Sequence, residues 1–180
     1  FALTVPFHSG DPVNFAFLDL KGLVINHNIP IGVDGGEVFD GVDVFRAFST
    51  ACYVYDNGAE IIYPVGTVEE AFEMKEKNHD FILIGERHEK KCEGFDFGNS
   101  PFEVSEVDFA GTAVIQRTSA GTQGIIPARQ AQCLYAASLV TASATARALR
   151  AQDTAERISL VAMGSAGLVR TDEDELCALH

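Results

Sequence analysis

From Val38 onward, short apolar segments alternate along the chain with segments that have the periodicity of amphipathic helices. Strands are predicted over residues 38–45, 61–65, 81–84, 111–117 and 158–163. Helices are predicted over residues 46–57, 67–77 and 139–151. Strands that alternate with helices pair mainly in parallel, because each helix carries the chain back across the sheet. We therefore expect an α/β fold with three layers, α/β/α, and a largely parallel or mixed sheet.

Several helix boundaries have recognisable cap residues. Thr67 followed by Glu70 forms a capping box at the start of one helix. Gly58, just after the helix at 46–57, suits the first position beyond a helix. A last helix is predicted to begin at Thr171, with Asp174 in its first turn, where acidic residues are favoured.

Two parts of the chain lack this alternation. The first 37 residues mix prolines with short apolar stretches such as Leu23–Ile25, and one or two strands are expected there. Residues 85–105 combine glycine, proline and charge, which predicts a long loop, and its three phenylalanines favour an ordered one. At a length of 180 residues, we expect residues 1–180 to form a single domain.

The charge balance limits the partners. The chain has 26 Asp and Glu residues against 13 Lys and Arg residues, a net charge of -13. Nucleic acids and anionic membranes need a basic face, so we expect neither as a partner. A small anion is still allowed, because charges more than about 8 Å away are screened and a few local arginines decide its binding.

Cysteine usage and hydropathy place the chain in a compartment. The four cysteines are far apart and show no metal-ligand spacing, which favours reduced thiols in a cytoplasmic protein. Cys52 and Cys133 sit among apolar residues and are expected in the core. No apolar run reaches the ~18 residues of a membrane span.

Polar residues gather at the ends of four predicted strands. Asp43 and Arg46 end the first strand, and the segments 85–87, 117–119 and 164–167 follow three others. In open α/β sheets, ligands bind beyond the carboxyl ends of the strands. Arginine forks and hydroxyl groups bind phosphate or sulfonate oxygens, and carboxylates suit Mg²⁺. The sequence therefore predicts a site for a small anion and a divalent metal at this edge of the sheet.

Each feature also has a simpler structural interpretation. Asp43 and Arg46 have the i, i+3 spacing of an ordinary ion pair at a helix start. The charged stretch 86–91 is typical of a solvated loop, and the glycine-rich turns can be turns alone. His79 and His88 have no partner at ligand spacing, so we interpret them as surface residues.

Several short motifs together resemble a known family. They are DVFRAFSTA at 43–51, NGA at 57–59, GER at 85–87, GFDFGNSPFE at 94–103, TSAGT at 118–122 and TDEDELCA at 171–178. In combination they resemble the 2-phosphosulfolactate phosphatases of coenzyme M biosynthesis, and the resemblance runs from about Val38 to the end of the chain.

The resemblance implies a Mg²⁺-dependent phosphatase, a hydrolase that converts a small anionic phosphate ester such as 2-phospho-3-sulfolactate into sulfolactate and phosphate. A homodimer is one assembly that it allows. Its implied catalytic residues are Asp43, Arg46, Glu86 and Asp96, of which Asp43, Glu86 and Asp96 would bind the metal directly or through water. The implied substrate-binding residues are Arg46, Ser49, Arg87, Asn99, Ser100, Arg117, Thr118, Ser119, Gly121 and Thr122. No covalent nucleophile stands out, so metal-activated water is the expected mechanism.

Two alternatives stay open. Ala120 stands where the family's turn usually has asparagine, and GER is followed by His88 and Glu89 instead of glycine. A phosphatase for another phosphate ester is one alternative, and a non-catalytic anion-binding module on the same fold is the other. The intact carboxylates favour an enzyme, whereas Ala120 favours the binding module. The family's chains are somewhat longer, so we expect a C-terminal part beyond residue 180.

Overall fold

A computed structural model describes residues 23–26, 37–128, 131, 133–150 and 157–179. The strands are β1 (Leu23–Asn26), β2 (Glu37–Val42), β3 (Ile61–Pro64), β4 (Ile82–Arg87), β5 (Lys90–Lys91), β6 (Ala113–Arg117), β7 (Cys133–Ala137) and β8 (Arg157–Ala162). The helices are α1 (Ala47–Asp56), α2 (Val68–Lys77), α3 (Pro101–Val104), α4 (Gly121–Ile125), α5 (Ala142–Arg150) and α6 (Asp172–Leu179).

The strands form two sheets of four strands each. One has the order β1-β8-β2-β7 and the other the order β3-β6-β4-β5. Every pairing is parallel except the short antiparallel pair of β4 and β5. The α/β class, the layered arrangement and the parallel strands confirm the prediction, and the strands are divided between two sheets.

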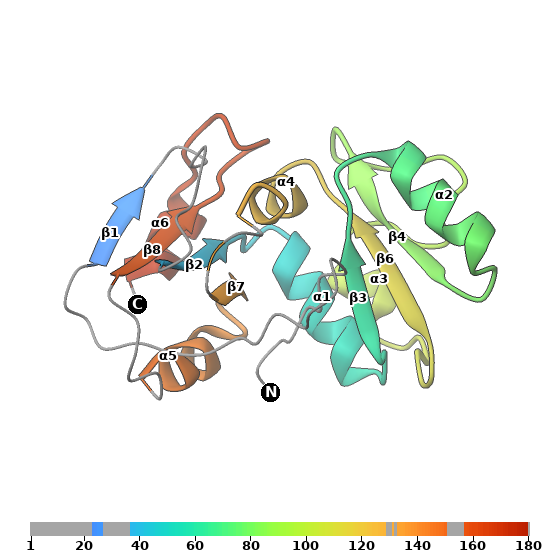
Figure 1. Ribbon diagram of the computed structural model, residues 1–180, viewed down its shortest axis with the longest axis horizontal. Coiled ribbons are helices and arrows are strands. Elements are labelled where there is room, and N and C mark those ends of the chain that lie inside the picture. The colour runs from blue at the N-terminus through green and yellow to red at the C-terminus, as the bar shows by residue number, and fades with distance from the viewer. Residues whose placement is uncertain (1–22, 27–36, 129–130, 132, 151–156, 180) are drawn as a thin grey trace.

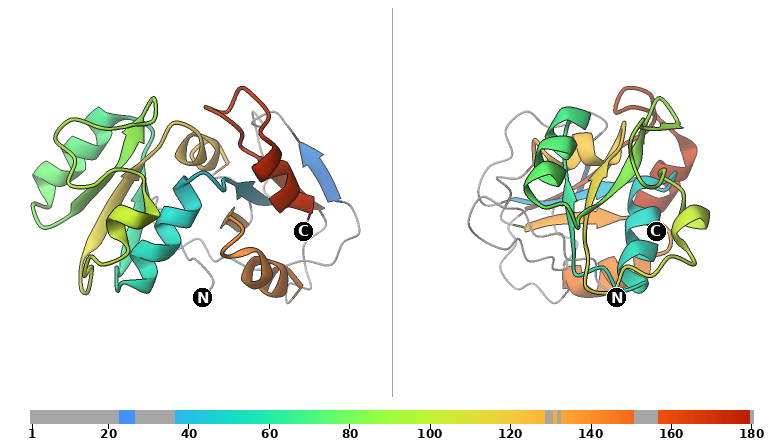
Figure 2. Two further views of the ribbon diagram at one scale, coloured as in Figure 1. Left: turned by 180° about the vertical axis from the view of Figure 1, so that it is seen from behind. Right: turned by 90° about the vertical axis from the view of Figure 1, so that its right-hand side faces the viewer.

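Helices lie between the two sheets and outside them (Figure 1). α1 and α4 lie between the sheets, and α2 covers the outer face of β3, β6 and β4 (Figures 1 and 2). Side chains alternate across this sheet, so that Ile84 and Val114 pack in the central core with Phe48 of α1. Leu83 and Ile115 pack on the other face with Ala71 of α2.

A third cluster packs α6 against β2 and β7 of the other sheet. Cys177 and Ala178 of α6 pack against Val42 of β2 and Ala137 of β7.

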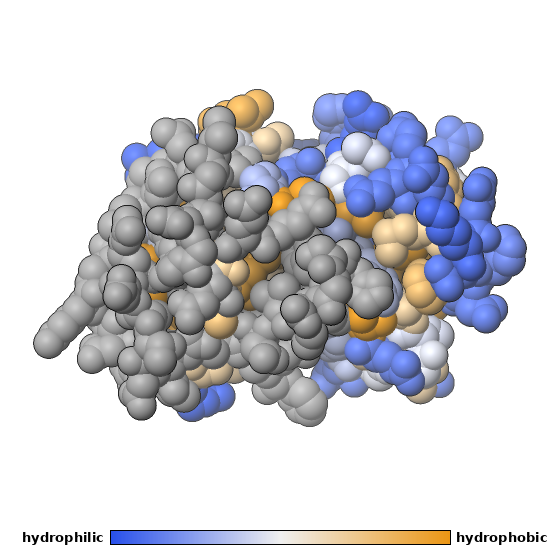
Figure 3. Space-filling view, viewed as in Figure 1, coloured by the Kyte–Doolittle hydropathy of each residue, from blue (hydrophilic) through white to orange (hydrophobic). Residues whose placement is uncertain are grey.

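The outer surface of α2 is hydrophilic (Figure 3). All four cysteines are free thiols. Within the described part of the chain, no helix combines the length and the hydrophobicity needed to cross a membrane.

The capping residues act as predicted. The Thr67 hydroxyl accepts a hydrogen bond from the Glu70 N–H at 3.0 Å, and the Glu70 carboxylate accepts one from the Gly66 N–H at 3.0 Å. Gly58 has a φ of 98°, and a Cβ atom there would lie 3.1 Å from the Ala110 Cα. Glycine is therefore required where the chain leaves α1.

The structure corrects several predicted boundaries. β2 ends at Val42, because Asp43 already turns toward α1 and accepts a hydrogen bond from the Ala47 N–H. Residues 85–105 are only partly loop, since they contain the end of β4, β5 and the short helix α3. β7 and α4 were not predicted, and β7 is buried throughout although its sequence is short and rich in alanine. Of the strands expected in the first 37 residues, β1 is present and the rest of that prediction lies outside the described residues.

The glycine-rich motif at 94–103 lies along β4 as an irregular extension of the sheet. The N–H groups of Asp96 and Phe97 donate to the Leu83 carbonyl at 3.0 and 3.1 Å, and the Gly85 N–H donates to the Phe97 carbonyl at 3.1 Å. The Gly98 N–H donates to the Glu103 carboxylate at 2.7 Å. These bonds fix the path of the segment and hold Asn99 near Glu86, at the carboxyl end of β4.

Candidate active site

A cavity of about 470 Å³ lies where the carboxyl ends of strands from both sheets meet. Its walls come from the segments after β2, β6 and β8, from the end of β4 and from the start of α6. The residues that line it include Asp43, Arg46, Glu86, His88, Glu89, Asn99, Thr118, Ser119, Glu173 and Asp174. The polar strand ends that the sequence set apart therefore do converge, as expected for parallel strands.

Asp43 is a buried carboxyl group in this cavity. It is 4% exposed, and its Oδ1 accepts a hydrogen bond from the Ala47 N–H at 3.1 Å. Burial, followed by the negative charge of Asp174, raises the pKa of Asp43 from 3.8 to about 7, against the lowering effect of the backbone N–H groups of Ala47 and Gly121. Asp43 therefore exchanges its proton near neutral pH.

Gly121 leaves space for the Asp43 carboxylate. A Cβ atom on Gly121 would lie 2.8 Å from Asp43 Oδ2 and 2.6 Å from the Ala47 Cβ. The first residue of α4 must therefore be glycine for α4 to approach this carboxylate. The role of Gly121 seen here is to admit the side chain of Asp43, and the residue itself does not line the cavity.

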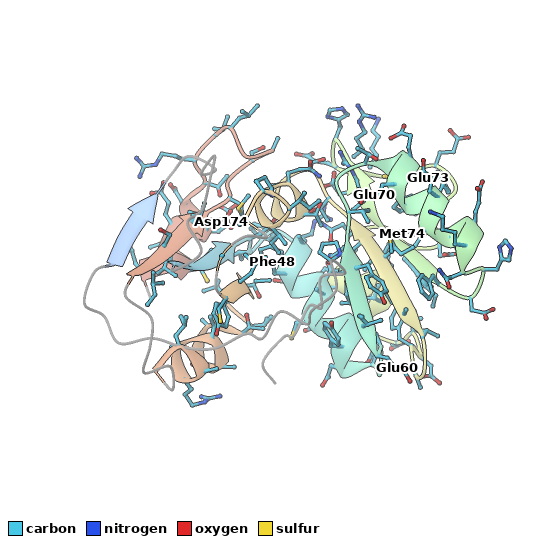
Figure 4. All side chains as sticks on the ribbon, viewed as in Figure 1. Phe48, Glu60, Glu70, Glu73, Met74 and Asp174 are labelled. Carbon is cyan, nitrogen blue, oxygen red and sulfur yellow. The ribbon has the colours of Figure 1, made fainter. Side chains whose placement is uncertain are left out.

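Asp174 is a cavity residue that the sequence did not single out. Its Oδ1 accepts a hydrogen bond from the Val44 N–H and its Oδ2 one from the Gly164 N–H, each at 2.8 Å. It therefore joins the ends of β2 and β8 from α6 (Figure 4). Burial raises the pKa of Asp174, and the charge of Glu173 adds to that effect. Acidic residues are common in the first turn of a helix, so the sequence around Asp174 did not predict its hydrogen bonds to Val44 and Gly164.

Glu86 is fully engaged in hydrogen bonds. Its Oε1 accepts from the Ser119 N–H, and its Oε2 accepts from the Ser119 hydroxyl and the Glu89 N–H, both at 2.9 Å. Arg117 donates from Nη1 to the Glu86 backbone carbonyl at 2.9 Å. Glu86 thus ties the end of β4 to the turn that follows β6.

Thr118 and Thr122 close that turn on itself. The Thr118 N–H donates to the Thr122 hydroxyl at 2.9 Å, and the Thr122 N–H donates to the Thr118 hydroxyl at 3.0 Å. Both side chains are buried. Both residues were predicted to bind the substrate. In the structure their hydroxyl groups stabilise the turn, and Thr118 also lines the cavity.

Arg46 and Asn99 differ from these engaged groups. Arg46 lines the cavity and is half-buried, and its guanidinium makes no hydrogen bond or ion pair with any residue that the structure describes. Asn99 is 7% exposed, and its Oδ1 is buried without a hydrogen-bond partner among the described residues. Buried polar atoms are normally paired, so an unpaired one in a cavity indicates a place for a ligand or water.

Other predicted residues lie outside the cavity lining. Ser49 donates its hydroxyl to the Val44 carbonyl at 3.0 Å. Arg87 is exposed and lines a second, more open hollow next to β5. Ser100 precedes α3, and its backbone carbonyl accepts a hydrogen bond from the Val104 N–H at 3.3 Å. Arg117 donates to the backbone carbonyl of Glu86.

The predicted set of three metal-binding carboxylates is not brought together. Asp96 Oδ2 accepts a hydrogen bond from the Leu83 N–H at 2.8 Å and lies 3.8 Å from Lys75 Nζ. Asp43 and Glu86 line the cavity, and Asp96 does not. Within the described ranges, no group of three or more His, Cys, Asp or Glu residues is arranged to hold a metal ion.

Comparison with known proteins agrees with the sequence resemblance. A family model described as 2-phosphosulpholactate phosphatase matches residues 40–180. A protein of Thermotoga petrophila named "Probable 2-phosphosulfolactate phosphatase" is 36% identical over 126 residues, which are 70% of this chain and 53% of the relative. A protein of Symbiobacterium thermophilum with the same name is 38% identical over 125 residues, which are 68% of this chain and 54% of the relative.

These matches cover only part of the relatives. A third relative of that name, from Clostridium perfringens, is 34% identical over 147 residues, which are 79% of this chain and 58% of the relative. The chain thus spans about half the length of the curated relatives that it matches. The matched residues include all the strand ends that form the cavity, and the chain belongs to the 2-phosphosulpholactate phosphatase family.

Proposed function

We propose that the cavity hydrolyses a small phosphate ester of a hydroxy acid, with 2-phospho-3-sulfolactate as the first candidate. The names of the relatives support this substrate. The observation that carries the proposal is the guanidinium of Arg46, which has no partner among the described residues and shares a cavity at the strand ends with the buried Asp43. A place in coenzyme M biosynthesis and a dimeric assembly stay predictions.

Arg46 is suited to bind the anionic groups of such a substrate. A phosphate ester that also carries carboxylate and sulfonate groups offers only hydrogen-bond acceptors at neutral pH. A guanidinium donates two parallel hydrogen bonds to such oxygens. Arg46 has no partner among the described residues, so within that part of the chain no ion pair must break before the substrate binds.

A Mg²⁺ ion fits two oxygen-bearing side chains that line this cavity, Asp43 and Asn99. Mg²⁺ keeps several of its waters and needs only one or two protein oxygens. Asn99 Oδ1, which has no hydrogen-bond partner among the described residues, would hold it together with the Asp43 carboxylate, which accepts hydrogen bonds from the backbone N–H groups of Ala47 and Gly121. The Glu86 oxygens accept three donors and have less capacity left. When bound, Mg²⁺ neutralises charge on the phosphate and lowers the pKa of water.

The reaction itself asks for positioning more than covalent chemistry. Water attacks phosphorus in line with the ester oxygen, so that one P–O bond forms as the other breaks. The water supplies the hydroxyl that phosphorus gains and the proton that the leaving oxygen gains. Arg46 holds the phosphoryl oxygens while the hydrogen-bonded turn after β6 keeps the wall of the cavity rigid.

Phosphate release by the full-length protein tests the proposal. The substrates are 2-phospho-3-sulfolactate and a small panel of phosphorylated hydroxy acids, each with Mg²⁺ and with EDTA. We expect release that requires the metal. Folded protein that releases phosphate from none of them would contradict the proposal and favour a non-catalytic anion-binding module.

The metal has a readout of its own. Mg²⁺ without substrate should raise the Tm of the wild-type protein by binding the folded state alone. The same addition should leave the Tm of Asp43→Asn unchanged. An equal shift in both proteins would place the metal elsewhere.

A further inference from the structure

The turn between β4 and β5 has a backbone conformation that its residues disfavour. Arg87 pairs with Lys90 across the two strands, so that only His88 and Glu89 form the turn. Their φ angles are 52° and 64°, both in the left-handed region. Two-residue hairpin turns of this type usually contain asparagine or glycine, because a Cβ atom at positive φ crowds the backbone.

Left-handed residues concentrate at the cavity. Besides glycines, the residues with such φ values in the part of the chain that the structure describes are His88, Glu89 and Ala166. All three line the cavity of Asp43 and Arg46. Unfavourable backbone conformations persist where the surrounding structure enforces them, and they gather at functional sites.

The surrounding structure does enforce this turn. The His88 N–H donates to the Ser119 hydroxyl oxygen at 3.2 Å, and the Glu89 N–H donates to Glu86 Oε2 at 2.9 Å. Ser119 in turn donates its hydroxyl to Glu86 at 2.9 Å. The turn is therefore fixed to the cavity wall, and His88, an exposed residue, lines both this cavity and the hollow next to β5.

The chemistry of His88 complements that of Arg46. Among the described residues that line the cavity, only Arg46 and His88 can carry a positive charge. The other ionisable residues there are the carboxylic acids Asp43, Glu86, Glu89, Glu173 and Asp174. An imidazole N–H donates a hydrogen bond to an acid oxygen in either protonation state. One guanidinium cannot bind every acid group of a substrate that carries two or more.

We propose that His88 is a specificity-determining residue that binds a second acid group of the substrate while Arg46 binds the phosphate. The inference rests on the proposed function and deepens it. The substrate class is then a phosphate ester with at least one further acid group, and simple phosphate monoesters are poor substrates. The left-handed turn sets where the imidazole lies.

The test compares His88→Gly with its neighbour, Glu89→Gly, in the full-length protein. Each glycine relieves one left-handed residue, so the Tm of both variants should shift alike, upward by about 2 °C. Only His88→Gly removes the imidazole. The readout is kcat/KM for 2-phospho-3-sulfolactate divided by kcat/KM for propyl phosphate, which has the same chain length and no other acid group.

We expect this ratio to fall about tenfold in His88→Gly, the loss of one charge-assisted hydrogen bond, and not to fall in Glu89→Gly, which removes a negative charge from the cavity lining. His88→Asn, which tolerates the backbone and keeps an N–H donor, should recover part of the ratio. A wild-type ratio in His88→Gly would overturn the inference while leaving the phosphatase intact. A wild-type protein that hydrolyses neither ester would overturn the proposed function instead.

Discussion

The two walls of the cavity use polar residues in opposite ways. The β4–β6 wall, defined by Glu86, Thr118 and Ser119, has its polar groups hydrogen-bonded within the fold. The β2 wall, defined by Asp43 and Arg46, holds a carboxyl group with a pKa raised to about 7 and a guanidinium without a partner among the described residues. The first wall stabilises the fold, and the second presents the Arg46 guanidinium and a carboxyl group that titrates near neutral pH to a ligand.

Sheet topology explains this difference. β4 and β6 are neighbours in one sheet, with Gly85 opposite Arg117, so the residues that follow them meet and bond to each other. The chain after β2 instead turns at once into α1, which lies between the two sheets. Arg46 at that turn therefore lines the cavity, and its guanidinium has no hydrogen-bonded neighbour in the part of the chain that the structure describes. Similar polar motifs at strand ends thus have different roles according to the strands beside them.

The largest effect is expected from the buried charge of the β2 wall. Asp43 binds its proton up to about pH 7 in the folded state but releases it near pH 3.8 when unfolded. Its contribution to stability is therefore full below pH 3.8 and is lost as the pH rises to about 7. In EDTA, the unfolding free energy of Asp43→Asn minus that of the wild type should grow by roughly 4 kcal/mol between pH 4 and pH 8.

Urea unfolding of both proteins across this pH range measures the difference. If the unfolding free energies of the variant and the wild type change in parallel with pH, the fold does not raise the pKa of Asp43 toward 7. Mg²⁺ should flatten the wild-type curve above pH 7, because the ion favours the charged carboxylate.

A smaller effect is expected from the β4–β6 wall. Glu86→Gln keeps the shape of the side chain but places an NH₂ group against N–H and O–H donors from Ser119 and Glu89. We expect a loss of about 2 kcal/mol in unfolding free energy, since hydrogen bonds to a charged acceptor are lost and donors stay unpaired. Chemical denaturation at pH 7 measures this loss, and a variant as stable as the wild type would show that this network does not stabilise the wall.

The smallest effect is expected at Asp96, which belongs to neither wall. Asp96→Ala removes the acceptor of the Leu83 N–H, a bond at a carboxylate whose side chain is 44% exposed. We expect a loss of about 1 kcal/mol in stability and an unchanged response to Mg²⁺. Loss of the Mg²⁺ effect on Tm in this variant would return Asp96 to the metal site, as the sequence resemblance had it.

Local patterns in the sequence predicted the features that local interactions determine. The Thr67 cap, the glycine at 58 and most strands follow from hydrogen bonds and periodicity within a few residues. Two separate sheets could not be predicted, because β2 pairs with β7 and β8, which come from much later in the chain. The strand β7 was missed because a short stretch rich in alanine is not distinctive.

For the candidate site, the sequence predicted which strand ends meet but not how their side chains bond. The convergence of Asp43, Arg46, Glu86 and Ser119 follows from parallel strands whose carboxyl ends meet. Their separation into bonded and free groups depends on which strands are neighbours, which the sequence does not show. Asp174 enters the site through bonds to Val44 and Gly164, and the acidic start of α6 had an adequate local explanation without them.

The most direct test of the β2 wall compares two arginines that the sequence treated alike. Arg46 lines the cavity, whereas Arg87 is exposed outside it. Isothermal titration of inorganic phosphate into the full-length protein, with Mg²⁺ present, should show affinity reduced at least about tenfold in Arg46→Ala, since a charge-assisted contact is lost. Arg87→Ala should bind phosphate as the wild type does. Equal binding by Arg46→Ala and the wild type, or a loss confined to Arg87→Ala, would contradict the account.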